Sequence, residues 1–353
     1  MRGDAQRFVR PGIRALHGYV PGEQPRDRRY VKLNTNENPY PPSPRVIEAV
    51  RAAVIDDLRL YPDPVATELR RKAGEVYGFA PEQIIAGNGS DDLLALIVRA
   101  CASAGDRVVY PMPTYSLYDT LVAIQDAEAA HVPFPADFTL PVAALRQLDG
   151  RVTFVCNPNA PSGTVTPVAV IEELARALSG LLVVDEAYVD FADATALPLV
   201  QRCPNVVVLR TFSKSFSLAG MRIGLGFGSA AVIEELNKVK DSYNLSRLSL
   251  VAATAALEDL AWMQRNVTRI RTTRAALSER LRALGLQVLP SQANFILARR
   301  PGRNMGDIQR ALKEQGVLVR YFDTPDLRDA LRITVGTDEE CEALLVALKP
   351  LLV

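Results

Sequence analysis

Short apolar runs alternate with amphipathic helical patterns through the middle of the chain. The apolar runs are rich in β-branched residues and cover residues 83–86, 106–110, 152–156, 181–184, 206–210 and 223–227. Between them, apolar positions recur at helical spacing near 45–55, 66–77, 91–102, 116–126, 167–179 and 231–240. Continuous apolar strands that alternate with helices are typical of a largely parallel sheet covered on both faces. We therefore predict an α/β domain here.

The pattern changes on either side of this region. Residues 246–284 carry a long helical pattern, after which strands are predicted at 286–289, 294–298, 317–320 and 331–334 and helices near 304–315 and 338–348. Prolines crowd the start of the chain, and because each one fixes φ and removes a backbone donor, residues 1–45 are predicted as an extended arm. The predicted organisation is an arm over 1–45 that is part of the small domain, a large domain over 46–245 and a small α+β domain over 246–353.

Charge and composition exclude several classes of function. The 353 residues hold 41 Lys and Arg against 40 Asp and Glu, and this balance lacks the basic surface of a nucleic-acid or membrane-surface binder. The apolar runs fall far short of the roughly 20 residues that a membrane span needs. The first residues lead into no apolar signal segment, so we expect a cytoplasmic protein with four reduced cysteines. With only two histidines, we expect neither a metal site nor a histidine-based triad.

Lys214 is the most informative residue, because it follows an apolar run and stands among small hydroxyl residues. A lysine just beyond a strand end lies where ligands bind in open α/β sheets. Ser213 precedes it, Arg222 follows eight residues later, and nearby glycines allow close backbone approach. An amine, a hydroxyl and a guanidinium together suit a phosphorylated aldehyde, whereas a lone lysine would more often be a solvated loop residue.

A glycine turn supplies a second candidate site. Gly87 and Gly89 end the run at 83–86, and a helical pattern begins at Ser90 and Asp91. The free N–H groups and the positive end of a helix dipole suit a phosphate at this point. Any strand-to-helix turn has the same features, so this motif is weak evidence by itself.

Other strand ends supply a carboxylate, phenols and amides. Asp185 ends an apolar run, and a buried carboxylate costs free energy unless it meets a cation, a protonated heterocycle or a turn to cap. Tyr188 follows three residues later and could donate to a ring oxygen. Tyr115 could stack on a flat ring or simply pack in the core. Asn157 and Asn159 lie in a turn-rich loop after another strand.

Together these motifs resemble the fold-type I family of pyridoxal-phosphate aminotransferases, from about residue 30 onward. Within that family the chain is most similar to the histidinol-phosphate aminotransferases, through Leu33-Asn-Thr-Asn-Glu-Asn-Pro-Tyr, Tyr61-Pro-Asp-Pro and Leu331-Arg-Ile-Thr-Val-Gly-Thr. The resemblance implies a large domain with a mostly parallel seven-stranded sheet flanked by helices, a smaller α+β domain, and a homodimer. It implies a reaction that interconverts L-histidinol phosphate and 2-oxoglutarate with imidazole-acetol phosphate and L-glutamate, in histidine biosynthesis.

The resemblance also implies roles for single residues. Lys214 forms the imine with pyridoxal phosphate, Asp185 meets the pyridine nitrogen, and Tyr188 meets the phenolic oxygen. The remaining implied cofactor-binding residues are Tyr115 on the ring, Gly89, Ser90, Asp91, Ser213 and Arg222 around the phosphate, and Tyr61 from the partner subunit. The implied substrate-binding residues are Tyr19, Asn38, Arg320 and Arg332. The family usually has an asparagine where this chain has Ala160, which leaves Asn159 or Asn157 to contact the phenolic oxygen.

Other activities are compatible with the same cofactor residues. An aromatic amino-acid aminotransferase differs only in its side-chain preference. A threonine-phosphate decarboxylase shares the cofactor residues but releases carbon dioxide. A non-enzymatic regulator built on this fold would carry an added DNA-binding domain, and residues 1–30 are too short and too rich in proline to form one.

Overall fold

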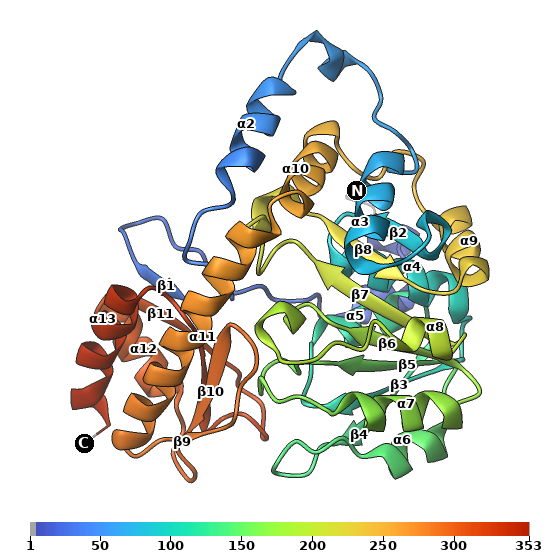
Figure 1. Ribbon diagram of the computed structural model, residues 1–353. Helices are drawn as coiled ribbons and strands as arrows, with labels where there is room; N and C mark the ends of the chain where they lie inside the picture. The colour runs from blue at the N-terminus through green and yellow to red at the C-terminus, as the bar shows by residue number, and fades with distance from the viewer. Residues whose placement is uncertain (1–4, 353) are drawn as a thin grey trace.

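The computed structural model describes residues 5–352 and contains two sheets (Figure 1). The larger sheet has seven strands in the order β2-β8-β7-β6-β5-β3-β4. Their bounds are β2 (Ile84–Gly87), β3 (Arg107–Met112), β4 (Glu128–Pro133), β5 (Val152–Cys156), β6 (Leu181–Asp185), β7 (Val206–Thr211) and β8 (Gly224–Phe227). Only β8 runs antiparallel to its neighbours, so the predicted seven-stranded, mostly parallel sheet is confirmed.

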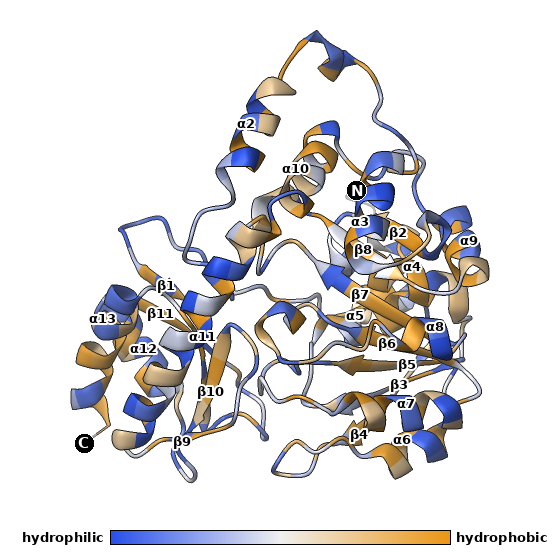
Figure 2. Cartoon of the chain, in the orientation of Figure 1, coloured by the Kyte–Doolittle hydropathy of each residue, from blue (hydrophilic) through white to orange (hydrophobic). Residues whose placement is uncertain are grey.

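Helices cover both faces of this sheet. They are α3 (Thr67–Tyr77), α4 (Ser90–Cys101), α5 (Leu117–Ile124), α6 (Val142–Leu148), α7 (Val168–Ala177), α8 (Leu199–Arg202) and α9 (Ala230–Val239). The helix α2 (Pro44–Ala52) packs against α10 (Arg247–Leu257), and α10 packs in turn against α3. Along β7, Val206 and Val208 pack into one hydrophobic cluster and Val207 and Leu209 into another, on the opposite face. Burial on both faces is the reason that the central strands are continuously apolar, as Figure 2 shows for β5 and β6.

The smaller sheet has the order β1-β11-β12-β10-β9. Its strands are β1 (Val31–Leu33), β9 (Gln287–Val288), β10 (Phe295–Arg299), β11 (Val317–Tyr321) and β12 (Ala330–Thr334). The helices α11 (Leu260–Ala283), α12 (Gly306–Glu314) and α13 (Asp338–Leu348) belong to the same part of the chain. The hydrophobic cluster of this part is separate from the two on the larger sheet.

The arm contains more regular secondary structure than its many prolines led us to predict. It contains the short helix α1 (Pro11–Ala15) and the strand β1, which pairs in parallel with β11 from Val31 opposite Val317. The prediction of a wholly extended arm was therefore wrong, because a strand from the far end of the chain supplies hydrogen-bond partners that no local pattern shows. Residues 1–4 of the predicted arm and Val353 of the predicted small domain lie outside the described residues.

Two further elements differ from the sequence predictions. The helical pattern over 246–284 is divided between α10 and α11, and the break falls at Glu258 and Asp259, where Asp259 accepts a hydrogen bond from Ser43. The edge strand β4 was not predicted, since its Glu-Ala-Ala-His-Val-Pro sequence lacks a β-branched run and its ladder comes from β3. Within residues 5–352, no helix is both long enough and apolar enough to cross a membrane.

Candidate active site

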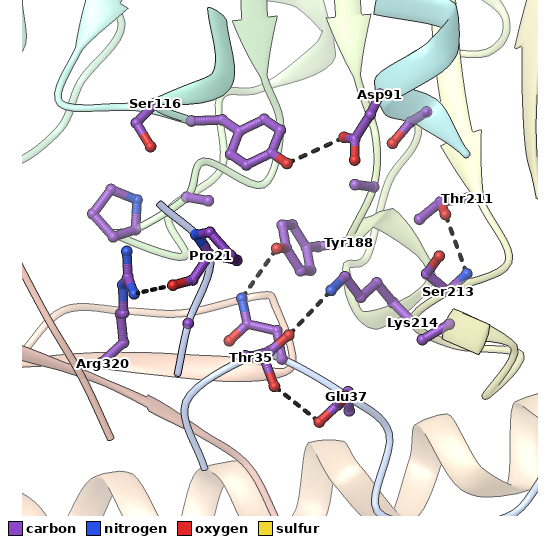
Figure 3. Close-up of a pocket in the computed structure, with 18 of the residues that line it drawn as sticks. Pro21, Thr35, Glu37, Asp91, Ser116, Tyr188, Thr211, Ser213, Lys214 and Arg320 are labelled. Atoms are coloured by element: carbon purple, nitrogen blue, oxygen red, sulfur yellow. Dashed lines mark hydrogen bonds between the residues drawn. The ribbon is translucent and has the colours of Figure 1, made fainter. Parts of the chain in front are cut away.

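A cavity of about 490 Å³ lies at the carboxyl ends of the parallel strands, with the arm and the smaller sheet on its other side (Figures 1 and 3). Ligands bind at this edge in open α/β sheets. Most of the predicted site residues line the cavity: Tyr19, Ser90, Asp91, Tyr115, Asp185, Tyr188, Ser213, Lys214, Arg222, Arg320 and Arg332. Residues from distant parts of the sequence therefore share one space.

Asp185 is the last residue of β6 and is only 2% exposed. Its Oδ2 accepts a hydrogen bond from the Tyr118 hydroxyl at 2.9 Å, and its Oδ1 accepts one from the Ala187 N–H at 3.2 Å. Burial raises the pKa of Asp185 to about 6, and the Tyr118 hydrogen bond opposes that rise. A carboxylate in this position is stabilised by a cationic partner, and the protonated nitrogen of a pyridine ring is one.

Lys214 follows β7, and its Nζ reaches back to the arm. The ammonium donates to the Thr35 carbonyl at 3.3 Å and lies 5.6 Å from the centre of the Tyr188 ring (Figure 3). Burial lowers the pKa of Lys214 to about 8, and the charge of Arg332 lowers it further. An amine with this pKa is partly neutral near pH 7.5, so it can act as a nucleophile and as a base.

The start of α4 forms a cradle for an anion. Gly89 is the N-cap at φ 90°, and no side chain caps the N–H groups that follow it. The φ of 90° favours glycine here, and the absence of a Cβ lets the Arg222 guanidinium approach, since a Cβ on Gly89 would stand 2.6 Å from its Nη2. Arg222 also donates to the Ser213 hydroxyl at 3.3 Å and lies 3.5 Å from the Asp91 carboxylate. These donors fit the phosphate of pyridoxal phosphate.

Tyr115 forms one wall of the cavity. Its hydroxyl donates to Asp91 Oδ1 at 3.1 Å, and its ring meets the rings of Tyr19 and Tyr118 edge-on at 5.8 and 5.7 Å. Burial, followed by the charge of Asp91, raises the pKa of Tyr115, so its phenol stays neutral. A neutral ring held by these contacts can lie against a flat aromatic ligand.

Two arginines face each other at the other end of the cavity. Arg320 on β11 stands directly opposite Arg332 on β12 in the strand register. Arg332 donates to the Asn34 carbonyl at 3.0 Å, and Arg320 donates to the carbonyls of Val20 and Pro21 at 2.9 and 3.2 Å. Burial lowers the pKa of Arg332 and the charge of Arg320 adds to that effect. Like charges placed directly opposite are unfavourable, so this pair suits an anionic ligand.

The structure places four predicted residues outside the cavity lining. Gly89 lies next to the Arg222 guanidinium, as described above. The Asn38 amide donates to the carbonyls of Lys214 and Ser215, both at 3.1 Å, and its contact with a substrate stays a prediction. Tyr61 is 78% exposed and stacks on Tyr243, with ring centres 4.4 Å apart.

Asn159 is the fourth residue outside the lining, and its amide is already hydrogen-bonded to other protein groups. It accepts from Thr114 and donates to Ser162 and to a backbone carbonyl. The amide of Asn157 bonds to the backbone of Thr166. Neither asparagine lines the cavity, whereas the apolar Ala160 does.

Sequence reasoning assigned no role to Tyr118 or to Asn34, Thr35 and Asn36, although the quoted motif at the start of the chain contains the three arm residues. Asn34 and Thr35 supply carbonyls to Arg332 and Lys214, and Asn36 bonds to Tyr188. The signal that could have found the segment is its run of polar residues directly after β1. Tyr118 lies in a tyrosine-rich stretch, but its contact with Asp185 depends on the packing of α5 against the sheet.

Comparisons with known proteins point to one family. The family model for class I and II aminotransferases matches residues 28–348. A histidinol-phosphate aminotransferase of Syntrophotalea carbinolica is 50% identical over 341 residues, which are 96% of this chain and 98% of that protein. Histidinol-phosphate aminotransferase 1 of Trichormus variabilis is 46% identical over 346 residues, 98% of this chain and 99% of that one. A crystal structure of the histidinol-phosphate aminotransferase of Sinorhizobium meliloti, in complex with pyridoxal-5'-phosphate, matches with a TM-score of 0.89 at 29% identity, and the match covers 97% of this chain and 96% of that one.

We predict that Tyr118→Phe raises the pKa of Asp185 above its present value of about 6, because the variant lacks the hydroxyl that stabilises the carboxylate. The carboxylate then forms only at higher pH. The pH at which the apo-protein reaches half-maximal binding of pyridoxal phosphate should rise by about one unit, the size of one charge-assisted hydrogen bond. Absorbance titration of cofactor binding at a series of pH values measures this.

Tyr110→Phe is the matched control for Tyr118→Phe. Tyr110 is fully buried in the same aromatic cluster, with its ring centre 5.6 Å from that of Tyr118, but its hydroxyl donates to Asp119. The Tyr110→Phe variant should therefore leave the pH of half-maximal cofactor binding unchanged. Equal shifts in the two variants would mean that the effect comes from cluster packing and not from Asp185.

Proposed function

The chain belongs to the class I and II aminotransferase family, and we therefore propose that it is a pyridoxal-phosphate-dependent histidinol-phosphate transaminase. It transfers the amino group of L-histidinol phosphate to 2-oxoglutarate, and the products are imidazole-acetol phosphate and L-glutamate. The observation that carries the proposal is the identity of 46–50% to histidinol-phosphate aminotransferases over nearly the whole chain. The paired arginines support it, since both half-reactions need a site for an anion.

The donors around the cavity fit pyridoxal phosphate at its two ends. Ser90, Ser213, Arg222 and the N–H groups at the start of α4 hold the phosphate, and Asp185 holds the pyridine nitrogen. When bound, pyridoxal phosphate supplies the electron sink for the charge that develops at the substrate Cα. Asp185 keeps the ring nitrogen protonated, and Tyr115 and Tyr188 orient the ring from its sides.

Lys214 carries the cofactor and moves the proton of the reaction. Its lowered pKa of about 8 gives it a neutral fraction that can take a proton from the substrate Cα. Thr35 holds the amine at a fixed place in the cavity, and the side chain of Asn38 holds the backbone of Lys214 from the arm side. The arm therefore contributes directly to the position of the base.

Arg320 and Arg332 receive the substrate anion. Arg332 Nε is buried and has no hydrogen-bond partner among the described residues, so a donor is free for a ligand. A guanidinium matches carboxylate and phosphate alike, which allows one site to take glutamate in one half-reaction and histidinol phosphate in the other. Tyr19 lies at the same end of the cavity.

We also propose that the protein works in the cytoplasm. Its four cysteines, Cys101, Cys156, Cys203 and Cys341, are free thiols, as is usual in a reducing compartment. Recovery of the protein from another compartment in a cell fractionation would contradict this location.

Borohydride treatment of the holoenzyme should attach the cofactor irreversibly to Lys214, and peptide mapping should find the label on that lysine. Lys214→Ala should lose the label and nearly all turnover, because no other group in the proposal both holds the cofactor and moves the proton. Lys238→Ala is the control, since Lys238 is an exposed helix residue paired with Glu235. A label on any other lysine refutes the assignment.

Substrate choice should separate the two arginines. We expect Arg332→Ala to lower kcat/KM for both histidinol phosphate and glutamate, by about ten- to a hundredfold for the loss of charged hydrogen bonds. Arg320→Ala should impair histidinol phosphate more than glutamate, because a phosphate has one more charge and one more oxygen than a carboxylate. Measurement of kcat/KM for both donors in each variant tests this. Preference of the wild type for phenylalanine, or release of carbon dioxide, would favour one of the alternative activities instead.

We propose that the active protein is a homodimer in which Tyr61 reaches the cofactor phosphate of the partner subunit. The region around Tyr61 supports this, because it exposes a series of large apolar side chains: Ile47, Val54, Ile55, Leu58, Leu60, Tyr61 and Val65. Figure 1 shows the segment that follows α2 projecting from the rest of the fold. An exposed apolar surface of this kind is typical of an interface.

A mixture of two impaired variants tests the dimer. Tyr61→Ala and Lys214→Ala should each be impaired alone, yet a mixture refolded together should recover activity, since a mixed dimer has one site with both residues intact. Sedimentation of the wild type at assay concentration provides the independent measurement. An active monomer would contradict both the dimer and the role of Tyr61.

A further inference from the structure

The hydroxyl of Tyr188 is hydrogen-bonded to Asn36, a residue to which the sequence analysis assigned no role. Asn36 donates its Nδ2 amide to this hydroxyl at 3.0 Å, and Asn36 is 1% exposed while Tyr188 is 9% exposed. Asn36 comes from the arm, three residues beyond the end of β1, and both residues line the cavity. The arm thus touches a residue that faces the expected ligand.

Thr334 on β12 determines which way the Asn36 amide faces. The Thr334 hydroxyl accepts the backbone N–H of Asn36 and donates its own proton to Asn36 Oδ1, each at 3.0 Å. Among the described residues the Thr334 proton has no other acceptor, so a flipped amide would leave it unpaired. Oδ1 therefore lies on the Thr334 side, and Nδ2 is left to face Tyr188. Asn294 donates to the Asn36 carbonyl at 3.0 Å and holds the backbone in place.

This arrangement decides the direction of the Tyr188 proton. A phenol has one proton, and an amide N–H that donates to the phenol oxygen leaves that proton for another acceptor. Tyr188 lines the cavity beside Lys214 (Figure 3), so its proton is available on the ligand side. If Asn36 carried an acceptor at this position, the proton would be drawn away from the cavity.

We propose that Asn36 is a positioning residue, which makes Tyr188 a hydrogen-bond donor toward the ligand. The inference rests on the proposed function, since the acceptor is the phenolic oxygen of pyridoxal phosphate. No amide from the loop 157–160 lines the cavity: Ala160 lines it there, the Asn157 amide bonds to Thr166, and the Asn159 amide bonds to Thr114, Pro113 and Ser162. The donor from Tyr188 therefore carries more of the contact with that oxygen.

Donation to the phenolic oxygen has a spectroscopic consequence. It stabilises negative charge on that oxygen, which lowers the pH at which the bound chromophore loses its proton. Visible absorbance of the holoenzyme follows that titration without any turnover. The titratable groups that surround Tyr188 are Arg332, Asp185, Cys156 and Tyr115, together with Lys214, which carries the cofactor in the holoenzyme. None of them is changed in the variants below.

Asn36→Asp reverses the hydrogen bond while it keeps the shape of the side chain. Aspartate tolerates the φ of 56° found here and still accepts the proton of Thr334. The neighbouring Arg332 favours its ionised form, which can only accept and so takes the Tyr188 proton. We expect the chromophore titration to move upward by about one to two pH units, the range of one charge-assisted hydrogen bond.

The new negative charge of Asn36→Asp would by itself raise the pH at which the chromophore loses its proton. The Tyr188→Phe background separates this charge effect from the redirection of the phenol proton. In the Tyr188→Phe background there is no phenol proton to redirect, so Asn36→Asp should produce only the smaller shift caused by its charge. A larger shift in the wild-type background supports the proposal. Equal shifts in the two backgrounds overturn it.

Thr334 allows a test that adds no charge. Thr334→Val removes the hydroxyl that orients the amide, so the amide can turn its oxygen toward Tyr188 and the titration should again move upward. Thr334→Ser keeps the hydroxyl and should titrate like the wild type. A Thr334→Val holoenzyme that titrates like the wild type overturns the assigned amide orientation, including in the case that Asn36→Asp does not fold.

The outcomes distinguish this inference from the proposed function. A wild-type protein that binds no pyridoxal phosphate refutes the function and the inference together. A wild type that binds the cofactor and transaminates, with a titration that Asn36→Asp leaves unchanged, refutes the inference alone.

Discussion

The burial of Asp185 and Lys214 at one edge of the larger sheet is the constraint on which the site depends. Loss of water disfavours the charged form of each group, so burial raises the pKa of Asp185 to about 6 and lowers that of Lys214 to about 8. The two values approach neutrality from opposite sides. Both groups can therefore exchange protons in a range where an ordinary carboxylate and an ordinary lysine in water do not.

The contacts around the cavity stabilise these groups without neutralising them. Tyr118 and the Ala187 N–H give Asp185 two hydrogen bonds, and a carbonyl of the arm receives the Lys214 ammonium. The arm can do this because β1 is anchored to β11 in the smaller sheet. The geometry of the lysine, which belongs to the larger sheet, thus depends on strand pairing in the smaller one.

Positive charge is concentrated at both ends of the cavity. Arg222 and the start of α4 form one anion site, and Arg320 with Arg332 forms the other. Repulsion between paired arginines costs stability in the absence of a ligand, and the backbone carbonyls of the arm partly offset it. A cofactor phosphate at one end and a substrate anion at the other would complete the charge balance.

The sequence by itself determined the alternation of strands and helices in the larger sheet, because strands buried on both faces must be continuously apolar. It also determined which strand ends carry Lys214, Asp185 and the glycine turn at Gly89, since parallel strands bring their carboxyl ends to one edge. These are local signals, and they can be recognised in the sequence without knowledge of the fold.

Only the tertiary structure decided the rest. The strand β1 exists because β11 pairs with it, and β4 exists because β3 does. Tyr118 bonds to Asp185 across 67 residues of sequence, and Asn36 bonds to Tyr188 across 152. The direction of a hydrogen bond depends on what the partner atoms already hold, as Thr334 shows for Asn36. Such partners leave no periodicity in the sequence, because their contact is made by the packing of the two sheets around the arm.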